Sequence, residues 1–346
     1  MMNRNSEPLT EVLEKYPFTV KGIRTESYKD KKGVWWVETT EGMKILKKHP
    51  NSEPMLHFLL AAIAHLQNNG IDIPRVNETI DGSPYVSIGE TCFILIDAVE
   101  GVNPDYRKPG ELNAIVRELG RFHLASEGFF PPDDAKVRRH LGNWQQDFSD
   151  TVSRLKDFYQ EEQNKAIHTE PGKIVLEVFP SFLQRMEAAI AGLDGPEYTA
   201  WVNKIDTGGG LCHQDFAAGN ILLSSAGKVY ILDTDSLTID LPARDIRKLL
   251  NKVMKKNGKW EPALLESVAR AYQQANPLTI DEWAVLKLDL TFPHLFTGIM
   301  DKYYRQREKD WTESKYLSRL KEMIAIERSL EEVLNNYDAI IKKITQ

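Results

Sequence analysis

The sequence predicts an α+β protein in two lobes, a small antiparallel sheet followed by a much larger helical region. Residues 1–97 alternate between strand-forming runs and one helical segment, whereas apolar residues after Asp97 repeat at helical spacing. At about 150 residues per domain, the 346 residues are enough for two such lobes. We therefore expect domains at residues 1–97 and 98–346.

The small lobe reads as two strand pairs and one helix. Residues 34–39 are β-branched and aromatic, and a turn at residues 40–42 leads to a short apolar run at 44–46, which predicts a hairpin. Ser52, Glu53 and Pro54 mark the start of a helix that ends near residues 68–70. Residues 85–88 and 91–96 predict a second strand pair.

Four helical patterns follow in the large lobe. They cover residues 112–122, 144–160, 174–191 and 317–341, with a gap near residues 170–172. Glu327 interrupts the apolar stripe of the last helix. Because the stripe is short and broken, we expect this helix to pack on its own lobe rather than form a coiled coil.

Composition excludes several classes of protein. The net charge of −6 argues against non-specific binding of nucleic acid. Residues 1–16 lack the apolar core of a signal peptide, and the longest apolar run, residues 58–66, is too short to span a membrane. Cys92 and Cys212 alone indicate neither a disulfide framework nor a zinc site. We expect synthesis in the cytoplasm.

One stretch carries chemically suggestive residues. Two short apolar runs, residues 221–223 and 229–232, flank a glycine-containing turn and predict a hairpin. Asn220 enters its first strand and Asp233 leaves its second, and Asp215 lies five residues before Asn220. We expect the three side chains to converge, and their oxygen atoms are the ligands that Mg²⁺ takes alongside phosphate.

The spacing of His213, Asp215 and Asn220 matches the catalytic loop of kinases. A polar loop with exposed carboxylates is the simpler interpretation of each residue alone, but the ordered set favours a protein-kinase-like fold. Such folds carry a phosphate-binding lysine on the third strand, where Lys47 falls; a solvated edge charge is the alternative. Ala98 lies in the segment 97–101, which could be a nucleotide-binding hinge or a linker.

The chain resembles the CotS-type spore coat proteins, within the aminoglycoside phosphotransferase and choline kinase branch of this fold. The resemblance covers nearly the whole chain and is carried by residues 119–129, 142–144, 213–235 and 242–246. It implies that Asp215 is the catalytic base, that Asn220 and Asp233 bind Mg²⁺, and that Lys47 binds the phosphates of ATP. If residues 97–101 are a hinge, Ala98 is expected to contact the nucleotide through its backbone. The resemblance also implies a structural role for Asp245 and a small, cationic acceptor.

Three features depart from the kinase pattern. The loop between the opening strands, residues 28–33, has a single glycine, and the helix after Lys47 has its only acidic residue, Glu53, at its start. The Lys–Glu pair of kinases is thus shifted or missing. Asp235 could be a further metal ligand or a turn cap.

Two functions remain open. One is an ATP- and Mg²⁺-dependent phosphotransferase that acts on a hydroxyl of a small molecule. The other is a catalytically silent structural component that docks with other spore coat proteins. The resemblance places either one in the spore coat after synthesis in the mother cell.

Overall fold

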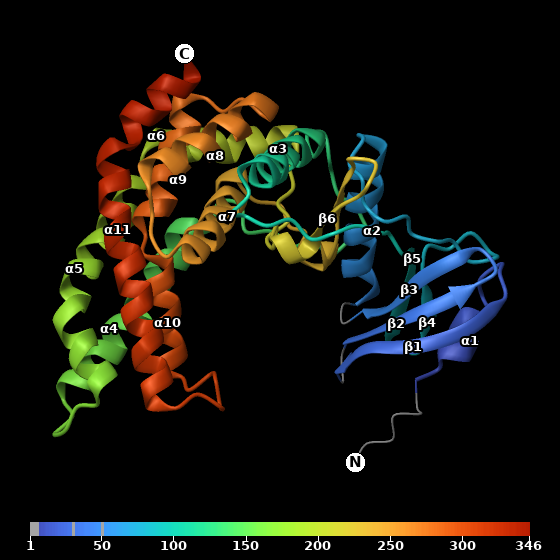
Figure 1. Ribbon diagram of the computed structural model, residues 1–346, viewed down its shortest axis with the longest axis horizontal. Helices are drawn as coiled ribbons and strands as arrows, with labels where there is room; N and C mark the ends of the chain where they lie inside the picture. Colours follow the sequence, from blue (N-terminus) through green and yellow to red (C-terminus); the bar gives the residue numbers. More distant parts are fainter. Residues whose placement is uncertain (1–6, 30–31, 50–51) are drawn as a thin grey trace. The chain divides into compact units, whose positions relative to one another are not determined.

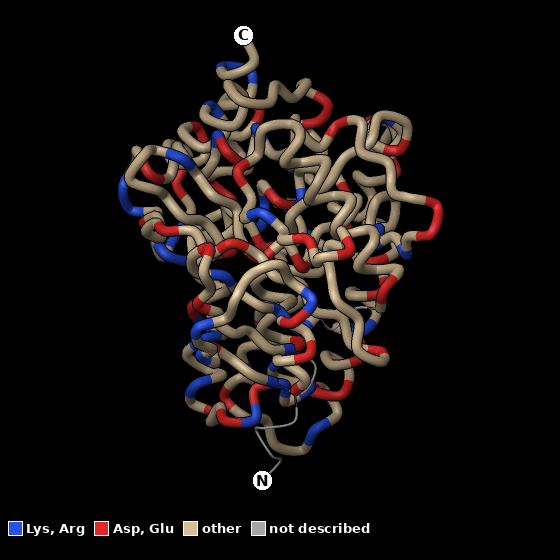
Figure 2. The backbone as a smooth tube through the Cα atoms, turned by 90° about the vertical axis from the view of Figure 1, so that its right-hand side faces the viewer, with Lys and Arg blue, Asp and Glu red and all other residues tan. Residues whose placement is uncertain are grey.

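The computed structural model describes residues 7–29, 32–49 and 52–346. The chain forms two units (Figure 1). The first contains Met1–Asn103, Phe130–Arg138 and Gly219–Asp235, and the second contains Pro104–Phe129, Arg139–Ala218 and Ser236–Gln346. The first unit thus continues past Asp97 and takes in two later segments. Acidic and basic residues are interspersed along the chain (Figure 2).

An antiparallel sheet of five strands forms the centre of the first unit, in the order β1-β2-β3-β5-β4. The strands are β1 (Val20–Lys29), β2 (Lys32–Thr39), β3 (Gly42–His49), β4 (Val86–Ile88) and β5 (Thr91–Asp97). Both predicted strand pairs are confirmed. The predicted loop at residues 28–33 is shorter, because β1 reaches Lys29 and β2 begins at Lys32; residues 30–31 lie outside the described residues.

The two faces of the sheet have different roles. Side chains alternate between faces along a strand, so Leu46 of β3 points into the core that α1 (Leu9–Leu13) covers. Its neighbours Lys47 and Ile45 line a cavity on the other face, together with side chains of α2 (Glu53–Asn68). Alternation along β3 therefore separates the stabilising residues from those available for binding.

A two-stranded hairpin completes the first unit. It consists of β6 (Ile221–Leu223) and β7 (Val229–Ile231), between the short 3₁₀ helices η1 (Ala218–Asn220) and η2 (Thr234–Ser236). The Leu232 N–H donates to the Asn220 carbonyl at 2.8 Å. This bond places Asn220 and Asp233 at the same end of the hairpin, as predicted.

The second unit is helical. Its helices are α3 (Pro109–Ala125), α4 (Trp144–Gln163), α5 (Glu170–Gly192), α6 (Pro196–Gly208), α7 (Pro242–Asn257), α8 (Pro262–Ala275), α9 (Ile280–Thr291), α10 (His294–Tyr304) and α11 (Glu313–Thr345). The last of these packs against α5, α8, α9 and α10 (Figure 1), which confirms that it belongs to its own lobe. Within the described residues, every helix is too short or too polar to span a membrane.

Two expectations for the helices need correction. The predicted gap at residues 170–172 is the first turn of α5, because the Thr169 hydroxyl accepts the Gly172 N–H at 3.1 Å and caps the helix. Glu327 does not break the stripe of α11. It is buried and pairs with Arg185 at 3.0 Å. Of residues 1–16, which were examined for a signal peptide, residues 1–6 lie outside the described residues.

Candidate active site

A cavity of about 710 Å³ lies on the sheet face of the first unit that carries Lys47. Its volume falls within the range of small-molecule and cofactor sites. Its apolar wall includes Val34, Ile45, Ile73, Ile94, Ile96 and Ile231, and its polar residues include Lys47, His49, Asn220, Asp233 and Asp235. An apolar wall beside a charged cluster suits a ligand with a flat ring at one end and ionic groups at the other.

Lys47 lies at the centre of the charged cluster. Its Nζ atom is 3.6 Å from Asp233 Oδ1 and 3.6 Å from Asp235 Oδ1. The next residue on the same face of β3, His49, is buried, and its Nε2 atom is 3.3 Å from Asp235 Oδ1. The segment that follows β7 and strand β3 of the sheet thus share a single ionic cluster.

Asp235 is ionised by its neighbours. Burial alone would raise the pKa of Asp235, but the contact with His49 and the charges of Lys47 and Lys32 hold this pKa well below its usual value. A turn cap needs no such surroundings. Asp235 therefore supplies the fixed negative charge that orients Lys47.

In this protein, Asp233 and Asp235 take the place of the glutamate that pairs with the lysine in protein kinases. Glu53, at the start of α2, accepts a hydrogen bond from the Tyr85 hydroxyl, so its described contact lies away from Lys47. Lys44, three residues before Lys47 on β3, is buried and pairs with Asp97 at 2.6 Å. Asp233 and Asp235, rather than a helical glutamate, hold Lys47 in the cavity.

Asn220 and Asp233 both line this cavity. Asp233 has a φ of +52°, in the left-handed region that few residues other than glycine adopt. Such backbone conformations are concentrated at functional sites. Carboxylate and amide oxygens at one end of a hairpin form a donor set that suits Mg²⁺.

The predicted hinge residue Ala98 donates its backbone N–H to the Met43 carbonyl at 3.1 Å. That bond extends the β3–β5 pairing by one residue, so this N–H is already used. The residues on either side, Asp97 and Val99, line the cavity. A nucleotide contact by Ala98 itself stays a prediction.

The predicted base Asp215 follows a tightly held loop in the second unit. Asp245 on α7 accepts the backbone N–H groups of His213 at 2.6 Å and Gln214 at 2.8 Å. Gln214 has a φ of +69°, and its carbonyl accepts a hydrogen bond from Lys248 at 2.9 Å. The Asp215 N–H donates to His213 Nδ1 at 3.3 Å. His213 and Asp245 thus brace the loop, which fits the structural role that the resemblance implies for Asp245.

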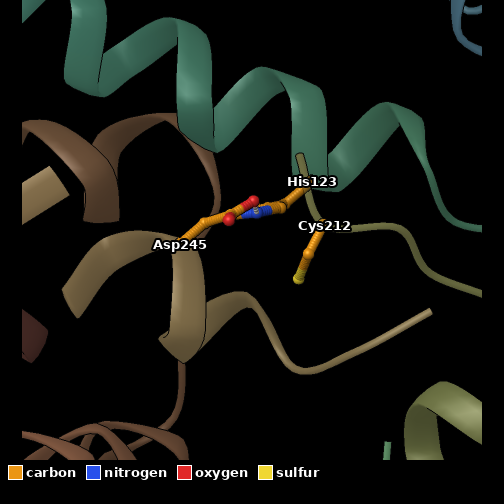
Figure 3. A group of neighbouring side chains, drawn as sticks. All are labelled: His123, Cys212 and Asp245. Carbon is orange, nitrogen blue, oxygen red and sulfur yellow. Dashed lines mark hydrogen bonds and ion pairs between the residues drawn. The ribbon is translucent and has the colours of Figure 1, made fainter. Parts of the chain in front are cut away.

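Three buried side chains lie together behind this loop: His123 of α3, Cys212 and Asp245 (Figure 3). Their donor atoms lie within 4.8 Å of one another, but each is already hydrogen-bonded. His123 contacts the Tyr272 hydroxyl at 2.7 Å and Asp245 at 3.3 Å, and the Cys212 thiol donates to a backbone carbonyl at 3.2 Å.

Hydrogen bonds within the protein account for the polar atoms of this cluster. Burial raises the pKa of the Cys212 thiol well above its usual value, and the thiol donates to a backbone carbonyl. Burial disfavours the charge of Asp245, but the hydrogen bond and charge of His123 lower its pKa. An ionised Asp245 accepting three hydrogen bonds fixes the backbone before Asp215.

Sequence reasoning missed the cation that pairs with Asp215. Lys252 of α7 forms an ion pair with Asp215, whose side chain is half exposed. Asp245, Lys248 and Lys252 are spaced three and four residues apart and share one face of α7. That spacing was a usable signal, because one helical face contacts His213, Gln214 and Asp215 in turn. The convergence of Asp215 with Asn220 and Asp233 stays a prediction.

Known proteins resemble the chain in sequence. The family described as "Spore coat putative kinase YutH" matches residues 21–337. Spore coat protein S of Bacillus subtilis (strain 168) is 32% identical over 340 residues, covering 97% of this chain and 95% of that protein. The chain therefore belongs to this family of spore coat kinase-like proteins.

Solved structures show the same fold. An aminoglycoside phosphotransferase from Alicyclobacillus acidocaldarius has a TM-score of 0.81 at 17% identity, over 99% of this chain and 98% of that one. Amicoumacin kinase hAmiN, solved with AMP-PNP and Ca²⁺, has a TM-score of 0.61 at 15% identity, over 92% of each chain. The protein-kinase-like α+β fold predicted from the sequence is confirmed.

Proposed function

We propose that this spore coat kinase-like protein is a phosphotransferase that transfers a phosphoryl group from ATP, with Mg²⁺, to a hydroxyl of a small molecule. The observation that carries the proposal is the ionic cluster of Lys47, Asp233 and Asp235 in a cavity with an apolar wall. A site kept only for structural reasons has no need of a lysine held between two carboxylates beside an apolar cavity.

The residues of the first unit would bind the nucleotide. Lys47 would contact phosphate oxygens, because a lysine held between carboxylates keeps its charge directed into the cavity. Asn220 and Asp233 would hold Mg²⁺, which when bound neutralises charge on the phosphates. The adenine ring would pack between the apolar residues, with the Val99 N–H and the Asp97 carbonyl as its backbone partners in place of the Ala98 N–H.

Asp215 would act on the acceptor. It would orient the acceptor hydroxyl and accept its proton as the oxygen forms a bond to the γ-phosphorus and ADP leaves. Lys252, which pairs with Asp215, would help to hold the carboxylate in place. The braced loop from His213 to Asp215 would fix the direction of this side chain, which is the main contribution a protein makes to phosphoryl transfer.

The site of action would be the spore coat. Support comes from the similarity to a spore coat protein along nearly the whole chain. Synthesis would take place in the cytoplasm of the mother cell, and other coat proteins would be the partners on assembly.

Nucleotide binding provides the direct test. Isothermal titration with Mg·ATP should show saturable binding to the wild type, and Lys47→Met should weaken it at least about tenfold by removing a charge-assisted contact. Asp233→Asn should reduce the dependence of binding on Mg²⁺. Lys48→Met is the matched control, since Lys48 is the next residue of β3 and pairs with Glu7 at 2.7 Å outside the cavity. Wild-type protein that does not bind Mg·ATP would refute the proposal.

The alternative is a coat component whose site is silent, and the name of the relative favours it. Deleting the gene and complementing it with Asp215→Ala separates the two functions. Full rescue of coat properties by Asp215→Ala would favour the structural role. Failure of rescue, with normal amounts of the variant in the coat, would favour the enzyme.

A further inference from the structure

A second cavity, of about 640 Å³, lies among the helices of the second unit. Five cationic side chains from three helices line it: Lys252, Lys255 and Lys256 of α7, Lys302 of α10 and Arg319 of α11. Glu322 is the one carboxylate among its described lining residues. Both signs are intermixed along the chain as a whole (Figure 2), so this concentration of positive charge is local.

Three of the cations have a carboxylate partner, and two do not. Lys252 pairs with Asp215, Lys302 with Glu308, and Arg319 with Glu322. Among the residues that the structure describes, no carboxylate lies within ion-pair distance of Lys255 or Lys256. The cavity therefore holds an excess of positive charge.

Burial and the surrounding positive charges change the pKa of Lys255. Partial burial of its ammonium group and the charge of Lys252 lower the pKa of Lys255, and the charges of Lys302 and Arg319 add to the effect while Glu322 opposes it. An anion in the cavity would relieve this repulsion. The arrangement is thus one that a negatively charged ligand stabilises.

Helix capping explains only part of the cluster. Lys255 and Lys256 lie in the last turn of α7, where cations interact favourably with the helix dipole. Lys302 likewise lies in the last turn of its own helix, α10, whereas Arg319 lies near the start of α11, far from the C-terminal end where the dipole favours a cation. A common ligand accounts for the convergence of all three helices.

Lys252 connects this cavity to the candidate chemistry. It lines the cavity and also pairs with Asp215, the proposed base. Tyr106 lines the cavity too, and its hydroxyl accepts the Ala218 N–H at 2.7 Å, three residues after Asp215. Trp311, whose ring centre is 5.5 Å from Lys302 Nζ, adds an uncharged surface.

We propose that this cavity binds the phosphate acceptor and that the acceptor carries an anionic group, a carboxylate or a phosphate, beside its hydroxyl. The proposal rests on the phosphotransferase function given above. It replaces the cationic acceptor that the family resemblance implied. The anionic group would bind Lys255, Lys256 and Arg319, leaving the hydroxyl near Asp215.

Ligand charge gives the first test. Isothermal titration of the full chain without nucleotide, at low salt, should show binding of sn-glycerol 3-phosphate and gluconate at least about tenfold tighter than binding of glycerol or choline. The affinity for the anions should fall as NaCl is raised. Choline or glycerol binding as tightly as the anions would overturn the proposal.

Variants locate the binding. Lys255→Gln and Arg319→Gln should each weaken anion binding about five- to tenfold, whereas Lys321→Gln should leave it unchanged. Lys321 is the matched control because it carries the same charge two residues from Arg319 on α11, is exposed and does not line the cavity. Equal effects of Arg319→Gln and Lys321→Gln would overturn the proposal.

Nucleotide binding separates this proposal from the function on which it rests. Mg·ATP binding to Lys255→Gln should equal that of the wild type, since Lys255 lies outside the nucleotide cavity. If anions bind as expected and Mg·ATP does not bind at all, the phosphotransferase function fails while the anion preference of the cavity stands. Transfer of phosphate from ATP to choline but to neither anion would refute the anionic acceptor alone.

Discussion

The two cavities differ in how their charges are balanced. In the first unit Lys47 lies between Asp233 and Asp235, so positive and negative groups are held against each other by strands and a short hairpin. In the second unit five cations face one lining carboxylate, and they extend from three helices on long side chains. The cavity around Lys47 suits a cofactor that combines negative phosphates with a metal cation. The cationic cavity suits an anion, and substitution of a few of its long side chains would change which anion it binds.

The largest expected effect separates chemistry from nucleotide binding. Asp215→Asn removes the proposed base and should lower the rate of phosphate transfer about a thousandfold. Mg·ATP affinity should stay within about twofold of the wild type, since the nucleotide residues belong to the first unit. The measurements are a coupled assay for ADP release and isothermal titration. An equal loss of transfer rate and of Mg·ATP affinity would contradict the assignment of chemistry to the second unit and of nucleotide binding to the first.

A smaller effect, on the free energy of unfolding, should show that Asp245 stabilises the loop before Asp215. Asp245 is buried and accepts the N–H groups of His213 and Gln214. Asp245→Ala leaves these donors and His123 without their partner, which should cost about 3 to 4 kcal/mol of unfolding free energy. Urea denaturation measures it. Asp206→Ala is the control, because Asp206 is an exposed residue paired with Arg139, and its loss should cost less than about 0.5 kcal/mol. A similar cost for the two variants would contradict the bracing role.

The smallest effect concerns pH. Burial and the charge of Arg247 lower the pKa of His294, which lines the cationic cavity, to about 4. The native state therefore keeps His294 neutral where the unfolded chain binds a proton. Stability should fall as the pH drops from about 6.5 to about 4, by up to about 3 kcal/mol. His294→Gln should flatten this part of the profile of unfolding free energy against pH. An unchanged slope in His294→Gln would show that other groups cause it.

The hairpin at the candidate site could be predicted from the sequence because its information is local. Two apolar runs and a glycine turn fix the strands, so Asn220 and Asp233 must share one end. The partner of Lys47 could not be found in this way. The kinase pattern places a glutamate on the helix after Lys47, and the sequence shows only that this pair is shifted or missing. Asp235 follows the hairpin far along the chain and meets β3 only after folding.

The cationic cavity of the second unit could not be predicted from the sequence for the same reason. Lys255, Lys302 and Arg319 lie on three helices separated by long stretches of sequence, and each alone reads as an exposed surface cation. The first turn of α5 was mistaken for a gap because Pro171 and Gly172 are common in loops, yet proline also fits the first turn of a helix. Local patterns therefore predicted the hairpin, both strand pairs and several helices, but not the charge of the second cavity.

The backbone at Asp233 has a consequence for how such a family can diverge. With a φ of +52°, this position favours asparagine and aspartate over other side chains that have a Cβ atom. An Asp→Asn exchange there would remove a negative charge while keeping the turn, the hairpin and the sheet. A single isosteric substitution at this position could thus separate an active kinase from an inert coat component, and both proteins would keep the same fold.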